Sequence, residues 1–183
     1  MEAVMWLLFA QGLMGAFDTL YYHEFRARLP ARPEARPELK LHAARDFIYA
    51  VIFGSLPWLA PRGAYAALLA ALLLAEIGIT LADFVVEDTV RRPQGGVFKG
   101  ERATHALMGI VHGAILAFLL PMLWHWVGEP TALVIAPPAI PLPLALALSA
   151  MAAGVAVSGV RDLLSAFGVK AAQWPHRGPV KAS

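Results

Sequence analysis

Five apolar stretches, each long enough to cross a lipid bilayer, constrain the fold of this chain more than any other feature. They fall at residues 3–25, 39–60, 64–88, 102–127 and 142–168, and about twenty helical residues cross the roughly 30 Å of membrane hydrocarbon. With 183 residues and 58% hydrophobic content, the chain is too apolar for a soluble domain and too short for two membrane domains. We therefore expect an all-α integral membrane bundle of five transmembrane helices in one domain, residues 1–170, followed by a polar cytoplasmic tail at 171–183.

Basic residues border the same end of these stretches and predict the orientation. The first and third connections hold Arg26, Arg28, Arg32, Arg36 and Lys40, and Arg91, Arg92, Lys99 and Arg102, respectively. By contrast, residues 61–63 carry only Arg62, and residues 128–143 carry no Lys or Arg. The positive-inside rule then predicts an outside N-terminus and a cytoplasmic C-terminus. We expect a multi-pass protein of a bacterial inner membrane, in contact with membrane lipids and not with nucleic acid.

Acidic and histidine side chains recur at helical spacing near the predicted cytoplasmic ends of the stretches. The sets that share one helix face are Glu76, Thr80, Asp83 and Glu87 in the third stretch, Glu101, His105 and His112 in the fourth, and His42, Asp46 and Tyr49 in the second. A charge at the centre of a membrane helix costs about 2.5–3.5 kcal/mol. Such a concentration therefore predicts mutual pairing or a bound metal.

The alternating direction of the spans sorts these side chains into levels. Nearest the cytoplasmic surface we expect Glu24, His42, Glu87 and Glu101, and about one turn deeper Asp18, Asp46, Asp83 and His105. Glu76 and His112 lie eleven residues from Glu87 and Glu101, respectively, or about 16 Å along a helix. We therefore expect that pair near the middle of the bilayer.

The first stretch presents a geometric conflict. On a regular helix His23 lies about 140° and Glu24 about 240° around the axis from Asp18. Asp18 and His23 cannot then both point inward unless the helix ends or bends between them. We expect Asp18 to point inward and favour His23 over Glu24 as a ligand.

The residue types predict a metal centre built from nitrogen and oxygen. The chain has no cysteine, which excludes thiolate sites and iron–sulfur clusters. Carboxylates and imidazoles that converge from four helices are what a two-metal carboxylate site requires. We predict two transition metal ions, iron in preference to manganese or zinc. The predicted ligands are Asp18, His23, His42, Asp46, Glu76, Asp83, Glu87, Glu101, His105 and His112.

This pattern resembles the ferritin-like diiron-carboxylate proteins, in which two helices each give a Glu and two others each give Glu-x-x-His. Here Glu101 and His105 are four positions apart, not three, and His42 precedes Asp46 in the reverse order. The segments FDTLYYHE, ITLADFVVED and ERATHALMGIVHGA also resemble parts of uncharacterised bacterial integral membrane proteins. That second resemblance implies no activity.

An iron centre in this position predicts an oxygen-dependent oxidoreductase. Its substrate would be a lipophilic small molecule taken from the cytoplasmic leaflet, with an electron donor as a potential partner. We take Glu76 and Tyr49 as the candidate catalytic residues.

Four other interpretations remain open from the sequence. With zinc the same ligands would make an intramembrane hydrolase, because zinc lowers the pKa of bound water to about 7. Glu76 and His112 could instead form a non-enzymatic proton or cation pathway, and His42 and His105 could hold haem. In the structural alternative, Asp18, Asp83 and Glu87 pair with Arg45, Arg91 or Arg102. The fifth stretch is expected only to support the other four.

Overall fold

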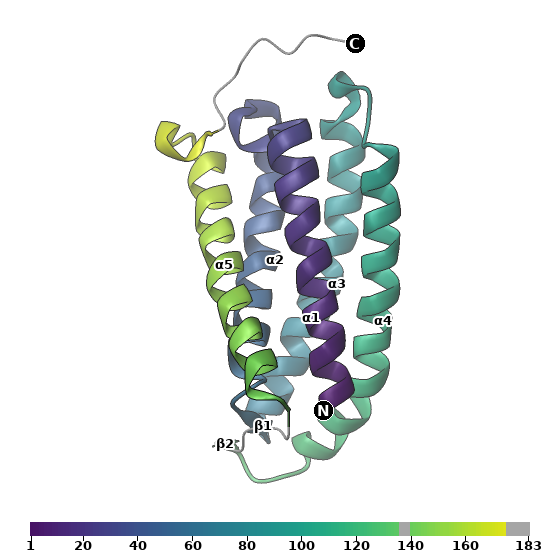
Figure 1. The fold of residues 1–183 in the computed structure, drawn as a ribbon, viewed down its shortest axis with the longest axis vertical. Coiled ribbons are helices and arrows are strands. Elements are labelled where there is room, and N and C mark those ends of the chain that lie inside the picture. Colours follow the sequence, from purple (N-terminus) through teal and green to yellow (C-terminus); the bar gives the residue numbers. More distant parts are fainter. Residues whose placement is uncertain (136–139, 175–183) are drawn as a thin grey trace.

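Five long helices stand side by side in the computed structural model, which describes residues 1–135 and 140–174 (Figure 1). They are α1 Glu2–Phe17, α2 Arg36–Ser55, α3 Ala64–Val90, α4 Lys99–Val127 and α5 Leu142–Ala166. The structure is 82% helical, so the all-α prediction is confirmed. Of the predicted tail, residues 175–183 lie outside the described residues.

Four of the helical stretches are long and apolar enough to cross a membrane. These are Glu2–Ala27, Ala64–Val90, Lys99–Val127 and Leu142–Ala166. The second predicted span, α2, is not among them, since it carries five charged residues, Arg36, Glu38, Lys40, Arg45 and Asp46. It nevertheless packs within the bundle, in contact with both α3 and α5 (Figure 1).

The helices form a closed ring around one interior. Helix α1 contacts α4 and α5, α2 contacts α5 and α3, and α3 contacts α4. The closest approach is between α2 and α5, where Gly159 faces α2. A Cβ atom at Gly159 would lie 3.0 Å from Cβ of Asp46 and 3.3 Å from the carbonyl oxygen of Ala43, so only glycine fits this contact without displacement.

The two ends of the bundle differ. At the end that holds the N-terminus, β1 Ala60–Arg62 pairs antiparallel with β2 Ala132–Val134, and Pro61 lies opposite Leu133 (Figure 1). This pairing joins the α2–α3 turn to the α4–α5 connection. The last residues of α5 lie at the opposite end (Figure 1).

The interior is apolar toward the β strands and polar toward the other end. The apolar core includes Val4, Met5, Leu8, Ile52, Leu56, Leu69, Leu119, Leu123 and Leu148. The buried polar side chains at the opposite end, which we call the polar end, are Asp18, His23, Glu24, Glu38, His42, Asp83, Glu87, Arg91, Glu101, Asp162 and Ser165. Charge is therefore concentrated where the chain makes its α1–α2 and α3–α4 connections.

The helix of the first stretch changes type midway. After α1 ends at Phe17, the chain continues as a π-helix over Asp18–Ala27. Hydrogen bonds in a π-helix join residues five apart, and the Arg28 amide accordingly donates to the carbonyl of His23. This register brings each residue over the one five positions later, so Asp18 and His23 share a face. The geometric conflict predicted for a regular helix is thereby removed.

The α2–α5 contact can be tested by adding one methyl group. Gly159→Ala should lower the free energy of unfolding by about 1–3 kcal/mol, because overpacking forces neighbouring groups apart. Gly154→Ala is the matched control on the same helix, since nothing lies within 4 Å of its Cβ position. Thermal unfolding in detergent measures the stability of both variants. Equal unfolding midpoints for Gly159→Ala and Gly154→Ala would contradict the close approach of α2 and α5.

Candidate metal centre

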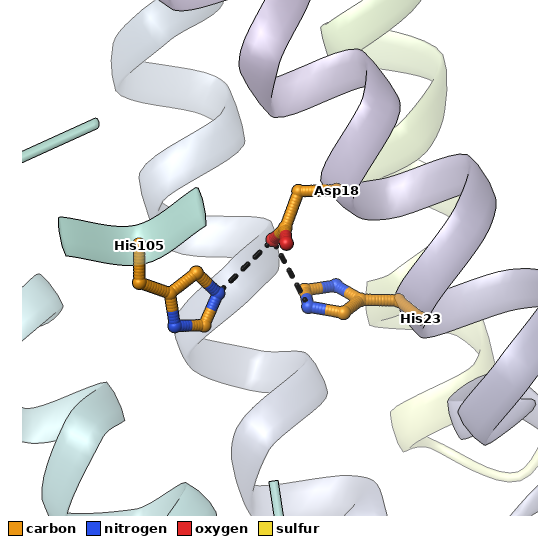
Figure 2. Close-up of side chains that lie close together, drawn as sticks. All are labelled: Asp18, His23 and His105. Atoms are coloured by element: carbon orange, nitrogen blue, oxygen red, sulfur yellow. Dashed lines mark hydrogen bonds and ion pairs between the residues drawn. The ribbon is translucent and has the colours of Figure 1, made fainter. Parts of the chain in front are cut away.

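Three side chains from the π-helix and α4 bring ligand atoms together at the polar end. Figure 2 shows the Asp18 carboxylate between the imidazoles of His23 and His105. Asp18 Oδ2 lies 3.2 Å from His23 Nε2 and 3.1 Å from His105 Nε2, and the three ligand atoms all lie within 4.8 Å of one another. Two ligands that bind one zinc-sized ion at about 2.0–2.2 Å stand roughly 3–3.5 Å apart. The spacing therefore suits a shared ion.

This first group contains buried atoms without hydrogen-bond partners. Asp18 is 2% and His23 5% exposed, and Asp18 Oδ1 and His23 Nε2 lack partners within the described part of the chain. His23 Nε2 lies close to Asp18 Oδ2 and 3.3 Å from Glu101 Oε1, but without hydrogen-bond geometry. An unpaired buried polar atom costs about 1–3 kcal/mol. Several in one place indicate that a further group, such as an ion or water, satisfies them.

A second ligand group adjoins the first through His105. Glu87, Glu101 and His105 also place ligand atoms within 4.8 Å of one another. Nε2 of His105 lies 3.1 Å from Asp18 Oδ2, and its Nδ1 lies 3.7 Å from Glu87 Oε1. Glu87 Oε2 is buried without a hydrogen-bond partner in residues 1–135 and 140–174. The two ligand groups therefore share His105.

Arginines balance part of the negative charge, as the structural alternative expects. Fully buried Arg91 donates from Nε to Glu38 at 3.0 Å and from Nη2 to Glu38 at 2.7 Å and Glu101 at 3.1 Å. Burial disfavours its charged form, but hydrogen bonding to Glu38 and the charges of Glu38 and Glu101 raise the pKa of Arg91 above its usual range. Arg45 also balances a carboxylate, since it donates a hydrogen bond to Asp83 at 3.0 Å.

The arginines do not balance all of the charge. Eight carboxylates gather at the polar end: Asp18, Glu24, Glu38, Asp46, Asp83, Glu87, Glu101 and Asp162. Three arginines, Arg45, Arg91 and Arg161, form ion pairs with them. Protonation of three histidines, His23, His42 and His105, would still leave more acids than cations. Bound cations, or protonation of the remaining acids, would offset this excess.

His42 and Asp83 lie beside the two ligand groups and belong to neither. His42 Nε2 is 3.2 Å from Asp83 Oδ2, and its Nδ1 is 3.8 Å from Asp162 Oδ2. The His42 ring stacks on His23 with centroids 4.6 Å apart and planes 9° from parallel. The predicted ligand Asp46 is only partly buried, next to Gly159. His42 therefore flanks His23 from the α2 side.

Glu76 and His112 form a separate cluster in the deeper interior, together with Tyr49. The Tyr49 hydroxyl lies 3.1 Å from Glu76 Oε1 and 3.2 Å from His112 Nδ1, and His112 Nε2 lies 3.1 Å from Glu76 Oε2. Thr80 also donates to Glu76 at 3.0 Å. His112 is seven residues beyond His105 on α4, about 10 Å along the helix. The structure thus groups the two candidate catalytic residues with His112, apart from the ligand groups.

The polar end also contains residues that sequence reasoning missed. Glu38 lies four positions before His42, and that spacing could have placed it on the same helix face. Arg161 and Asp162 interrupt an otherwise apolar stretch of α5, which is itself a signal of an inward role. Helix α5 therefore contributes charged groups to the interior in addition to packing.

Neither family models, curated proteins nor solved structures give a match to this chain. The functional argument therefore rests on the geometry of the polar end.

Removal of Arg91 should test whether the buried ion network stabilises the fold. Arg91→Ala leaves Glu38 and Glu101 buried without their cation, and breaking such a pair costs about 3–5 kcal/mol. The control is Arg92→Ala, whose side chain is 73% exposed in its pair with Asp88 and for which we expect less than about 1 kcal/mol. Similar unfolding midpoints for the two variants would contradict a stabilising role for Arg91.

Proposed function

We propose that this chain is a membrane-embedded metalloprotein that holds two transition metal ions at the polar end of its bundle. The observation that carries the proposal is the pair of ligand groups that meet on His105, with buried ligand atoms that lack hydrogen-bond partners. The excess of carboxylates over arginines supports it independently. Asp18, His23 and His105 would hold one ion, and Glu87 and Glu101, whose group also includes His105, would hold the other.

The proposed setting is a bacterial inner membrane, with the N-terminus outside and the polar end cytoplasmic. Four apolar helices of sufficient length support membrane insertion. The basic residues of the α1–α2 and α3–α4 connections support the orientation, since they lie at the polar end. The ligand groups would then lie near the inner leaflet.

The activity that we propose is oxidation of a lipophilic substrate with dioxygen at a diiron centre. Imidazole and carboxylate ligands suit iron, with manganese and zinc as alternatives, and the resemblance to diiron-carboxylate proteins favours iron. Bound iron would supply dioxygen activation, and an electron donor would be the partner. Exposed apolar side chains on α3 and α4, among them Leu81, Phe84 and Leu107, would place the substrate's hydrocarbon part next to the centre.

The protein's own residues would position and insulate this chemistry. Arg91 fixes one oxygen of Glu101, which keeps that carboxylate charged and oriented. The apolar core on the β-strand side of the centre would limit water access from the other end. Tyr49, hydrogen-bonded with Glu76 and His112, would act as the deeper donor and acceptor of protons, in the catalytic role proposed for Tyr49 and Glu76.

One observation favours a zinc hydrolase as the second candidate. Asp18, His23 and His105 make a set of one carboxylate and two imidazoles, and catalytic zinc sites commonly have three protein ligands with a fourth position open to water. Glu87, next to His105, would then be the general base. A non-enzymatic proton or cation pathway would instead use the separate pair of Glu76 and His112.

Metal content is the direct test. Protein purified without chelators, or reconstituted with iron(II), should hold about two transition metal ions per chain by elemental analysis. His105→Ala should lose both, because His105 belongs to both ligand groups, whereas Asp18→Ala should lose one. His125→Ala is the control, since this exposed histidine lies in the last turn of α4 beside Glu129, outside both ligand groups. Wild-type protein that stays metal-free after reconstitution would eliminate the proposal.

Substitution of Glu76 in the deeper cluster should distinguish between the candidate activities. Glu76→Gln should keep the wild-type metal content, because Glu76 lies outside both ligand groups. In the oxidoreductase, the same change should reduce oxygen consumption by the reduced protein by about 10²–10⁴-fold, the usual contribution of an acid–base group. Proton flux in liposomes that falls with Glu76→Gln, without any oxygen consumption, would instead favour the pathway.

A further inference from the structure

The first ligand group depends on an unusual helix register. Asp18 and His23 share a face only because the helix is of the π type over Asp18–Ala27. π-helices mostly occur as single-turn insertions in α-helices, and this one extends over ten residues. Contacts from outside the helix must therefore favour this register over the α register.

A bidentate ion pair supplies such a contact one residue after His23. Nη1 and Nη2 of Arg161 on α5 donate to Oε1 and Oε2 of Glu24, respectively. Glu24 is buried, and within the described residues Arg161 is its only ion-pair partner. A paired fork of this kind fixes orientation as well as distance. It therefore sets the rotation of the helix at Glu24 and, through the adjoining backbone, at His23.

Arg161 is itself held in place from the C-terminal side. Its Nε donates to the carbonyl of Ala172 at 3.4 Å, and Nη2 donates to the carbonyl of Trp174. Its Cζ lies 4.2 Å from the centroid of the Trp174 ring. Ser165, one turn along α5, donates to the carbonyl of Pro30 just beyond the π-helix. These contacts hold the Arg161 guanidinium in place in addition to its ion pair with Glu24.

If residues 18–27 formed an α-helix, the Glu24–Arg161 ion pair and the approach of His23 to Asp18 could not both form. Relative to Asp18, His23 would move to about 140° and Glu24 to about 240° around the axis. Rotation of Glu24 away from Arg161 would leave a buried charge uncompensated, which is strongly unfavourable. The ion pair and the Asp18–His23 approach therefore require the same backbone register.

We propose that Arg161 and Glu24 form a register lock that holds Asp18–Ala27 in the π form and so positions His23 beside Asp18. Arg161 is a positioning residue and not a ligand, and its effect on metal binding rests on the function proposed above. Since Trp174 and Ala172 orient Arg161, the segment that follows α5 belongs to the lock.

A double-mutant cycle tests the pair. Glu24→Gln and Arg161→Gln should each weaken binding of the first ion by about 10–100-fold, the usual effect of removing a group that orients a ligand. The double variant should lose no more than either single variant, because both remove the same interaction. Arg62→Gln is the control, since it breaks the Arg62–Glu129 pair at the opposite end. Additive losses, or unchanged affinity in the single variants, would overturn the lock.

Amide hydrogen exchange in metal-free protein tests the register lock independently of metal binding. In metal-free protein, Arg161→Gln should speed exchange of residues 18–27 by at least about tenfold and leave α3 unchanged, whereas Arg62→Gln should leave residues 18–27 unchanged. Trp174→Ala should act in the same direction with a smaller effect. Equal exchange of residues 18–27 in wild type and Arg161→Gln would overturn the lock even if metal binds. Conversely, faster exchange of residues 18–27 in Arg161→Gln, when the wild-type chain binds no metal, would support the lock and reject only the metal centre.

Discussion

Compensation of buried negative charge is the constraint on which the rest of this structure depends. A carboxylate inside an apolar bundle must be neutralised, paired or bound to a cation, and the polar end gathers eight of them. The position of nearly every other polar group there follows from this requirement. Arg91 lies between Glu38 and Glu101, Arg45 reaches Asp83, and the histidines face carboxylates on one or both ring nitrogens.

Structural ion pairs and the two proposed ligand groups account for most of the carboxylates at the polar end. Arginines form ion pairs with Glu24, Glu38 and Asp83, which flank the ligand groups. Asp18 and Glu87 contact histidines and no arginine among the ion pairs of the described residues. Glu101 belongs to both sets, because Arg91 holds the same oxygen that His23 approaches. Of the polar-end carboxylates without an arginine ion pair in the described residues, Asp18 and Glu87 belong to the ligand groups, whereas Asp46 and Asp162 lie outside them.

The sequence predicted the helices and the concentration of polar side chains near one end of the bundle, because helical periodicity and hydrophobic length are local properties. It named both Asp18 and His23 as ligands but could not predict the π register that brings them together, since residues five apart do not share a face of an α-helix and the π register depends on Arg161 far along the chain. The role of α5 was missed for a similar reason. At Gly159 the chain allows α5 to approach α2 closely, and one turn later Asp162 Oδ2 lies 3.8 Å from His42 Nδ1.

Charge is compensated differently in the deeper cluster and at the polar end. Tyr49, Glu76 and His112 contact one another pairwise, and Gln11 and Thr80 add hydrogen bonds to the cluster. Among the described residues, no arginine or lysine takes part in these contacts, so His112 is the basic group in direct contact with Glu76, and Arg45 acts on the cluster only through its charge. Because about two helical turns separate His112 from His105, the cluster would serve the proposed metal centre by relay and not by ligation. A proton that moves between Glu76 and His112 through Tyr49 would therefore change charge deep in the bundle while the ligand groups keep their geometry.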